Sequence, residues 1–181
     1  MFRSIDAFLT YFEGVNGRAL RDINALPAAA DGWIPATGEG EKAWSINKLI
    51  GHMCGSRMYF ASAFSGSGWI SPPPPDVSRR ELWAPALQAS FDSFAATIRS
   101  IKDRRLEEKI QTIDSPFGLS GWRVLAMMVE HDIHHRSQID TYAGLNGWDV
   151  PQIYNRSAET IGGLQESERA KHGLTGEGDA L

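Results

Sequence analysis

Three of the five histidines in this chain lie within five consecutive positions, in the run 120–145 that predicts one long helix. Successive residues of an α-helix are rotated by about 100°, so His135 lies about 40° from His131, on the side that also carries apolar residues. His134 lies about 60° away in the other direction, at the rim of the apolar stripe. Two imidazoles four positions apart can converge on one metal ion. The pair His131 and His135 therefore predicts part of a metal site; the alternative is two core-facing rings bonded to backbone or water.

A third ligand has to come from another helix, because a catalytic site of the zinc type takes three protein ligands and leaves one position open. His52 is the one remaining histidine inside a helical apolar face, whereas His172 falls in a polar carboxyl-terminal segment. A single histidine on an apolar face is more often an ordinary buried residue than a ligand. Spacing alone leaves the third ligand open.

Two better-known metal patterns fit this helix poorly. In an HExxH metalloprotease the acid beside the first histidine is the general base, but here that acid is Asp132, one methylene shorter and rotated about 100° from His131. A di-iron bundle needs glutamate ligands and a repeated Glu-x-x-His. Glu130 directly precedes His131 and has no counterpart elsewhere.

Other reactive side chains have plain structural alternatives. Cys54 is close to His52 in sequence but about 200° away on the helix, which favours packing in the core or in an interface over a nucleophilic role. Asp132, Arg136 and Gln138 are candidates for residues around the metal site or the pocket. Their alternative is a solvated side chain or a salt bridge within the bundle.

Apolar residues at helical spacing predict the elements that must position these groups. The expected helices are residues 4–26 and 45–65 with Ser4 and Ser45 as N-caps, 78–101 with a capping box from Ser78 to Glu81, 120–145, and a short last helix over 151–164. Pro85 must kink the third helix or mark its start. Residues 109–118 predict a small hairpin. We therefore expect an all-α four-helix bundle over residues 1–165 with a short extra C-terminal helix, followed by a polar, flexible tail over 166–181.

Composition limits the partners. The 181 residues are 42% hydrophobic and 22% charged, with a formal net charge of -4, so a nucleic-acid partner is disfavoured. No apolar run approaches the ~20 residues of a membrane span. The single cysteine excludes an internal disulfide. We expect a cytoplasmic protein that acts on a small molecule.

A second apolar line on the 120–145 helix indicates self-association. Trp122, Val129 and Ile133 lie at about 160–200° from His131, opposite the first apolar stripe. A helix that is apolar on two sides is either central or packed against another subunit. This line predicts a homodimer.

Over residues 2–165 the chain resembles the DinB-like (DinB/YfiT) family. The resemblance lies in Trp44-Ser45 with His52 seven positions later, in the stretch His131-Asp-Ile-His-His135-Arg-Ser-Gln-Ile139, and in residues 147–151, Gly-Trp-Asp-Val-Pro. Two positions depart from the family pattern: Ser137 stands where glycine is usual, and Asp132 where glutamate is common.

The resemblance implies an up-down-down-up bundle, commonly a homodimer, that holds a divalent ion such as zinc or nickel. By position it assigns His52, His131 and His135 as the metal ligands. Characterised relatives include thiol-dependent S-transferases and isomerases that use low-molecular-weight thiols such as bacillithiol or mycothiol. A thiol-dependent S-transferase is therefore the first expectation, although the sequence identifies no catalytic acid or base.

Two rival functions remain. A metal-dependent hydrolase would use metal-bound water and a nearby base, for which Asp132 and His134 are the nominees. A small-ligand-binding bundle with a structural metal would need no catalysis, but structural sites usually have four protein ligands.

Overall fold

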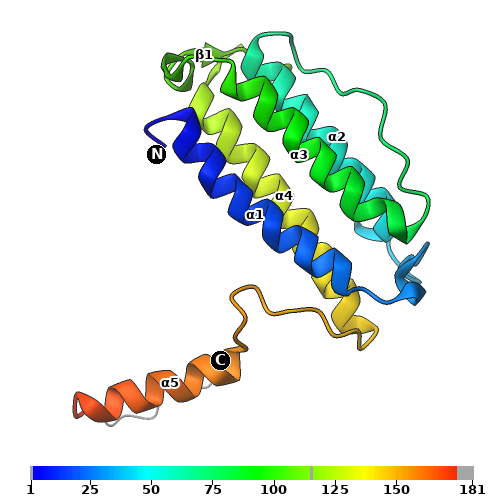
Figure 1. Ribbon diagram of the computed structural model, residues 1–181, viewed down its shortest axis with the longest axis vertical. Helices are drawn as coiled ribbons and strands as arrows, with labels where there is room; N and C mark the ends of the chain where they lie inside the picture. Colours follow the sequence, from blue (N-terminus) through cyan, green and yellow to red (C-terminus); the bar gives the residue numbers. More distant parts are fainter. Residues whose placement is uncertain (1, 115, 175–181) are drawn as a thin grey trace. The chain divides into compact units, whose positions relative to one another are not determined.

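The computed structural model describes residues 2–114 and 116–174, and its contacts divide the chain into Met1–Val150 and Pro151–Leu181. The first unit contains α1 (Ile5–Ala25), α2 (Ile46–Ser65), α3 (Trp83–Arg99) and α4 (Gly121–Leu145), with the short 3₁₀ helices η1 (Ala28–Ala30), η2 (Gly40–Ala43), η3 (Arg80–Leu82) and η4 (Asp103–Leu106) in the connections. The all-α prediction is confirmed (Figure 1).

Contacts between helix ends fix the direction of each helix. Arg105, just after α3, donates from Nε to the carbonyl oxygen of Phe64 at the end of α2 (2.8 Å), so α2 and α3 run in the same direction. The backbone amide of Ile5 donates to Asp103 (2.8 Å), so α1 begins where α3 ends. A Cβ on Gly121 would overlap the carbonyl oxygen of Arg105, so α4 also begins there, at a position that only glycine fits. Hence α1 and α4 run one way and α2 and α3 the other (Figure 1).

The predicted N-terminal caps agree with the structure at two of three places. The hydroxyls of Ser4 and Ser45 accept from the backbone amides three residues later, as expected of N-caps. The capping box at Ser78 was wrong: α3 starts at Trp83, and its N-cap position makes no side-chain bond. Pro85 therefore lies in the first turn, where its missing N–H would have had no helical partner.

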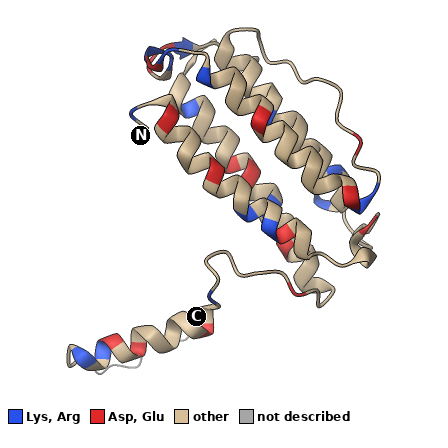
Figure 2. Cartoon of the chain, viewed as in Figure 1, with Lys and Arg blue, Asp and Glu red and all other residues tan. Residues whose placement is uncertain are grey.

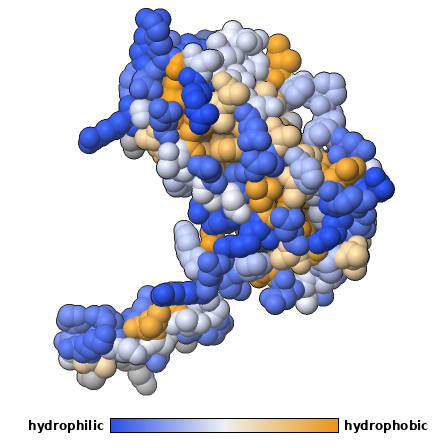
Figure 3. Space-filling model, viewed as in Figure 1, coloured by the Kyte–Doolittle hydropathy of each residue, from blue (hydrophilic) through white to orange (hydrophobic). Residues whose placement is uncertain are grey.

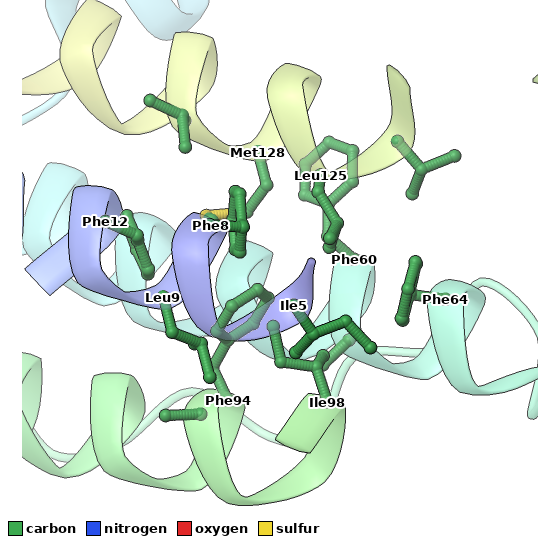
Figure 4. Packing of buried hydrophobic residues seen from close by; sticks show 14 of the residues in the cluster. Ile5, Phe8, Leu9, Phe12, Phe60, Phe64, Phe94, Ile98, Leu125 and Met128 are labelled. Carbon is green, nitrogen blue, oxygen red and sulfur yellow. The ribbon is translucent and has the colours of Figure 1, made fainter. Parts of the chain in front are cut away.

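The core consists of two apolar clusters along the bundle. One gathers aromatic side chains from α1, α2 and α3, with Phe12 and Phe94 edge to face at 5.3 Å between ring centroids (Figure 4). The second apolar line of α4 belongs largely to this cluster: Val129 is buried, and Trp122 and Ile133 are partly buried against it. The visible face of the bundle in Figure 3 mixes hydrophobic with hydrophilic residues.

The predicted hairpin is present as a minimal antiparallel pair, β1 (Lys109–Ile110) and β2 (Leu119–Ser120). In the second unit, α5 covers Ala158–Lys171, later than the expected 151–164, because the hydroxyl of Ser157 caps it by accepting from Thr160. The helix thus includes the first residues of the expected tail, and residues 175–181 lie outside the described part of the chain. Among the helices described, none combines the length and the apolar character of a membrane span.

Candidate metal centre

Two helices bring the three predicted ligands together. His52 comes from α2 and His131 and His135 from α4, and the Nε2 atom of His131 is 2.9 Å from that of His52 and 3.1 Å from that of His135. Donors of a tetrahedral site with metal–nitrogen bonds of ~2.0–2.1 Å lie about 3.3 Å apart, so the rings fit a single ion with little movement. Within the described residues, this cluster includes no fourth histidine, cysteine, aspartate or glutamate.

The protonation of the three rings suits metal binding. Burial lowers the pKa of His131 to about 3, and the neighbouring His135 and His52 rings act in the same direction. Burial also lowers the pKa values of His52 and His135. A ring that is neutral at pH 7 presents a lone pair instead of a proton, which is the form that ligates metals.

Gln138 orients one of the ligands. Its Oε1 is 3.2 Å from Nδ1 of His135, and because an amide oxygen only accepts, the proton of that ring lies on Nδ1 and the Nε2 lone pair faces the cluster. The amide nitrogen of Gln138 donates to the backbone oxygen of Glu41 (2.8 Å) and to the Tyr142 hydroxyl (3.2 Å). Of the candidates around the site, Gln138 is the one in contact with a ligand.

Ser56 is a site residue that the sequence reasoning did not assign. Its hydroxyl lies 3.5 Å from Nε2 of His52 and 3.4 Å from Nε2 of His131. Ser56 is one helical turn after His52 and so lies on the same line of α2; this spacing was the available signal.

Asp132 points away from the cluster. Its carboxylate binds the Arg57 guanidinium through two bonds of 3.1 and 2.7 Å, with both side chains buried. Arg57 also donates to the backbone oxygen of Leu87 (2.7 Å) and to the Ser90 hydroxyl (3.1 Å). The nomination of Asp132 as a base was wrong, and its alternative role as a bundle salt bridge is correct. The available signal was Arg57, a charge between the apolar Met53 and Phe60 of α2.

The remaining candidates lie outside the cluster. His134 is exposed, and its Nε2 is 3.3 Å from the Glu41 carboxylate at the edge of the site. His172 pairs with Glu168 in the second unit. Cys54 is buried in the second core cluster, and burial raises the pKa of its thiol, so packing is its role. Arg136 is buried beside the Asp22 carboxylate at 3.7 Å.

A groove of about 780 Å³ opens beside the cluster. Its floor is one face of α2, and its wall is the connection from α2 to α3, in particular the proline run 72–75. His52 and His131 are among its lining residues, so a molecule in the groove would lie against two of the three ligands. Trp44 covers the site from the start of α2, with its ring stacked near His135 and edge-on to His52.

Residues 1–168 match the sequence model of the DinB family. The chain belongs to the DinB family. A crystal structure of a DinB-like protein from Bacillus cereus ATCC 10987 superposes with a TM-score of 0.65 at 16% identity, covering 84% of this chain and 99% of that one. A DinB-like protein from Bacillus subtilis gives 0.61 at 14% identity, over 81% and 96%. At these identities the likeness establishes the fold, and no curated protein matches the chain.

The departures from the DinB pattern leave the ligands untouched. Ser137 is exposed on α4, where no tight packing demands glycine. Asp132 is bound to Arg57, a role in which its shorter side chain suffices. DinB membership and the histidine cluster are together compatible with a divalent metal.

Proposed function

We propose that this protein is a metal-dependent S-transferase that joins a low-molecular-weight thiol to an electrophile. Its metal is a divalent transition ion, zinc or nickel, held by His52, His131 and His135. The observation that carries the proposal is the convergence of three neutral imidazoles beside an open groove. A bound ion would supply the positive charge that keeps a thiol ionised, and the thiolate is the nucleophilic form.

The side chains of the protein position the reactants. Gln138 fixes the His135 ring, and Trp44 shields the ligands from solvent. The Ser56 hydroxyl lies beside two ligand nitrogens, where it can donate a hydrogen bond to an anionic sulfur. The groove holds the electrophile against His52 and His131.

A metal-dependent hydrolase is the second candidate. With Asp132 bound to Arg57, the base would have to be His134, which lies with Glu41 close to His135. The exposure of His134 weakens this role, because a general base works best in a site that excludes water. A bundle whose metal is structural, serving as a small-ligand binder, would show neither activity.

Thiol consumption is the measurement that separates these functions. The zinc- or nickel-loaded protein is incubated with a thiol and a generic alkylating electrophile, and in parallel with a simple ester. We expect thiol loss that stops on chelation and in His131→Ala, and that continues in the control variant His172→Ala. Ester turnover alone would establish the hydrolase, and no turnover of either substrate would refute both enzymes.

Two further expectations belong to this proposal. We propose a homodimer on the basis of the family resemblance, because the second apolar line of α4 packs largely into the core of the chain itself. Sedimentation at micromolar concentration tests the homodimer, and a monomeric mass would contradict it. We also propose a cytoplasmic location, which cell fractionation tests.

A further inference from the structure

The groove beside the histidines contains an unexplained feature in its floor. Gly51 and Gly55 lie one turn apart in the interior of α2, where glycine is less favourable than alanine. The contact at Gly51 explains the first: a Cβ there would come within 3.1 Å of Val77 on the opposite wall. A Cβ on Gly55 would meet nothing within 4 Å. Close packing therefore does not explain the glycine at position 55. A glycine there does leave the groove wider than a larger side chain would.

The wall opposite this floor is preformed. The proline run lacks backbone N–H groups and has a restricted φ angle, so it forms a stiff extended segment. The amide of Asn47 donates to the backbone oxygens of Val77 and Ser78, both at 3.0 Å, and holds one end of the segment. The indole of Trp69 donates to the backbone oxygen of Gln111 (2.7 Å) and holds the other end. A wall anchored at both ends keeps the groove from collapsing.

The charge of the groove is one-sided. None of the described lining residues is acidic, and Lys48 is the lining side chain with a fixed positive charge. Its ammonium lies 4.3 Å above the Trp44 ring, and no ion pair is seen for it among the described residues. The wall segment 66–78 contains one charged residue, Asp76 (Figure 2). Its carboxylate accepts from the backbone amide of Ser78. An anion entering the groove meets one cation on a surface that is otherwise uncharged and mostly apolar.

These groups follow one another along α2. Lys48, His52 and Gly55 are spaced by about one helical turn each, and from Lys48 to Tyr59 the helix rises about 16 Å. A ligand lying along this face would extend from the Lys48 ammonium, past His52, to the part of the groove beside Gly55, Tyr59 and Phe60. We call this last part the trough.

We infer that the groove binds an amphipathic organic acid, with its acidic group at Lys48, its reacting atom beside His52 and its apolar arm in the trough over Gly55. The inference rests on the proposed function, since it names the substrate class of the same site. Gly55 sets the size of the arm, and Lys48 selects its charge. Neither residue belongs to the three-histidine cluster.

Calorimetric titration with straight-chain acids tests the trough. Hexanoate, octanoate and decanoate are titrated into the zinc-loaded and the metal-free protein, and we expect affinity to rise about fourfold per methylene. Gly55→Leu fills the trough and should weaken decanoate binding at least tenfold, with Gly55→Ala in between. Gly17→Leu on α1, at an exposed site with equally free space, is the matched control. Affinity independent of chain length, or unchanged in Gly55→Leu, overturns the inference.

Lys48→Gln tests the anionic end. In the metal-free protein, where a carboxylate has no ion to bind, decanoate should bind about two- to fivefold more weakly, and decanol as before. Lys102→Gln, at an exposed lysine outside the groove, is the control. An equal loss for acid and alcohol, or no loss for either, overturns the choice of an acid.

Zinc stoichiometry, measured on the same samples, separates this inference from the proposed function. Chain-length dependence in a protein that binds no zinc would leave the groove assignment standing and refute the metal enzyme. Stoichiometric zinc binding without chain-length dependence would leave the metal enzyme standing and refute the groove assignment.

Discussion

His131 and Asp132 are neighbours on α4, yet they serve two polar clusters of opposite character. Asp132 faces the core and is bound through both oxygens to Arg57, whose Nη1 also donates to the backbone oxygen of Leu87 and to the Ser90 hydroxyl. His131 faces the groove, where its Nε2 meets two other ring nitrogens, and its Nδ1 has no partner among the described residues. A rotation of about 100° therefore separates a satisfied ion pair from a set of unused lone pairs. The first holds three helices together, and the second is available to a ligand.

Loss of Asp132 should give the largest effect. Asp132→Leu leaves the Arg57 charge buried without a partner, which costs about 3–5 kcal/mol of unfolding free energy. The double variant Arg57→Met/Asp132→Leu should recover most of that loss, because an apolar pair needs no charge compensation. Urea denaturation of the metal-free proteins measures both. A double variant no more stable than the single one would contradict the assignment of this pair to structure alone.

His131→Ala should have the opposite profile. Zinc affinity should fall by more than about 100-fold, the upper end of what losing an outer partner of a ligand costs. Unfolding free energy of the metal-free protein should change by less than about 1 kcal/mol. Competition with a chromophoric chelator gives the affinity, with His134→Ala as the neighbouring control. Equal zinc affinity in the two variants would show that His131 is not a zinc ligand.

Gln138→Leu should have a smaller effect on the same property. Without the bond to Nδ1, the His135 ring loses its preferred tautomer, and zinc affinity should fall about 10- to 100-fold. Gln138→Glu keeps the acceptor and should retain affinity. Ser137→Ala, on the exposed side of α4, controls for changes to the helix. If the leucine and glutamate variants behave alike, hydrogen bonding to His135 is not the role of Gln138.

The smallest effect is expected at Asp140, which belongs neither to the Arg57–Asp132 ion pair nor to the histidine cluster. Burial and the nearby Asp22 charge raise the pKa of Asp140 to about 6, against the lowering effect of Arg136. The folded chain therefore keeps a proton that the unfolded chain loses from about pH 4, so this group costs stability as pH rises through about 4 to 6.

Asp140→Asn removes that cost. It should match the parent at pH 4 and exceed it by about 1 kcal/mol at pH 7, a value lowered by the partial exposure of the side chain. Denaturation across this pH range, with exposed Asp149→Asn as control, measures the difference. A constant offset at all pH values would show that Asp140 does not titrate in this window.

The sequence predicted what depends on local periodicity. Apolar spacing located the four long helices, and the i, i+4 spacing placed His131 and His135 on one face. The partner of Asp132 could not be derived in this way, because the pair joins residues 75 positions apart and depends on how α2 turns toward α4. The convergence of His52 on the other two rings came from family resemblance for the same reason.

Local rules also failed where tertiary contacts compete with them. At Ser78 the predicted capping box does not form, because the backbone amide of Ser78 donates to the Asp76 carboxylate instead. Asn47 and the Trp83 indole both donate to the backbone oxygen of the adjoining Val77. From the sequence, Gly55 would only lower the helix propensity of its segment, because the groove that it lines exists only in the folded chain.

X-ray absorption spectroscopy of the zinc-loaded protein tests the central claim most directly. We predict one zinc per chain with three imidazole nitrogens and one exchangeable light atom at about 2.0–2.1 Å, the light atom giving way to sulfur at about 2.3 Å when a thiol is added. Fewer than three imidazoles, or a first shell that is the same in His131→Ala, would contradict the three-histidine site.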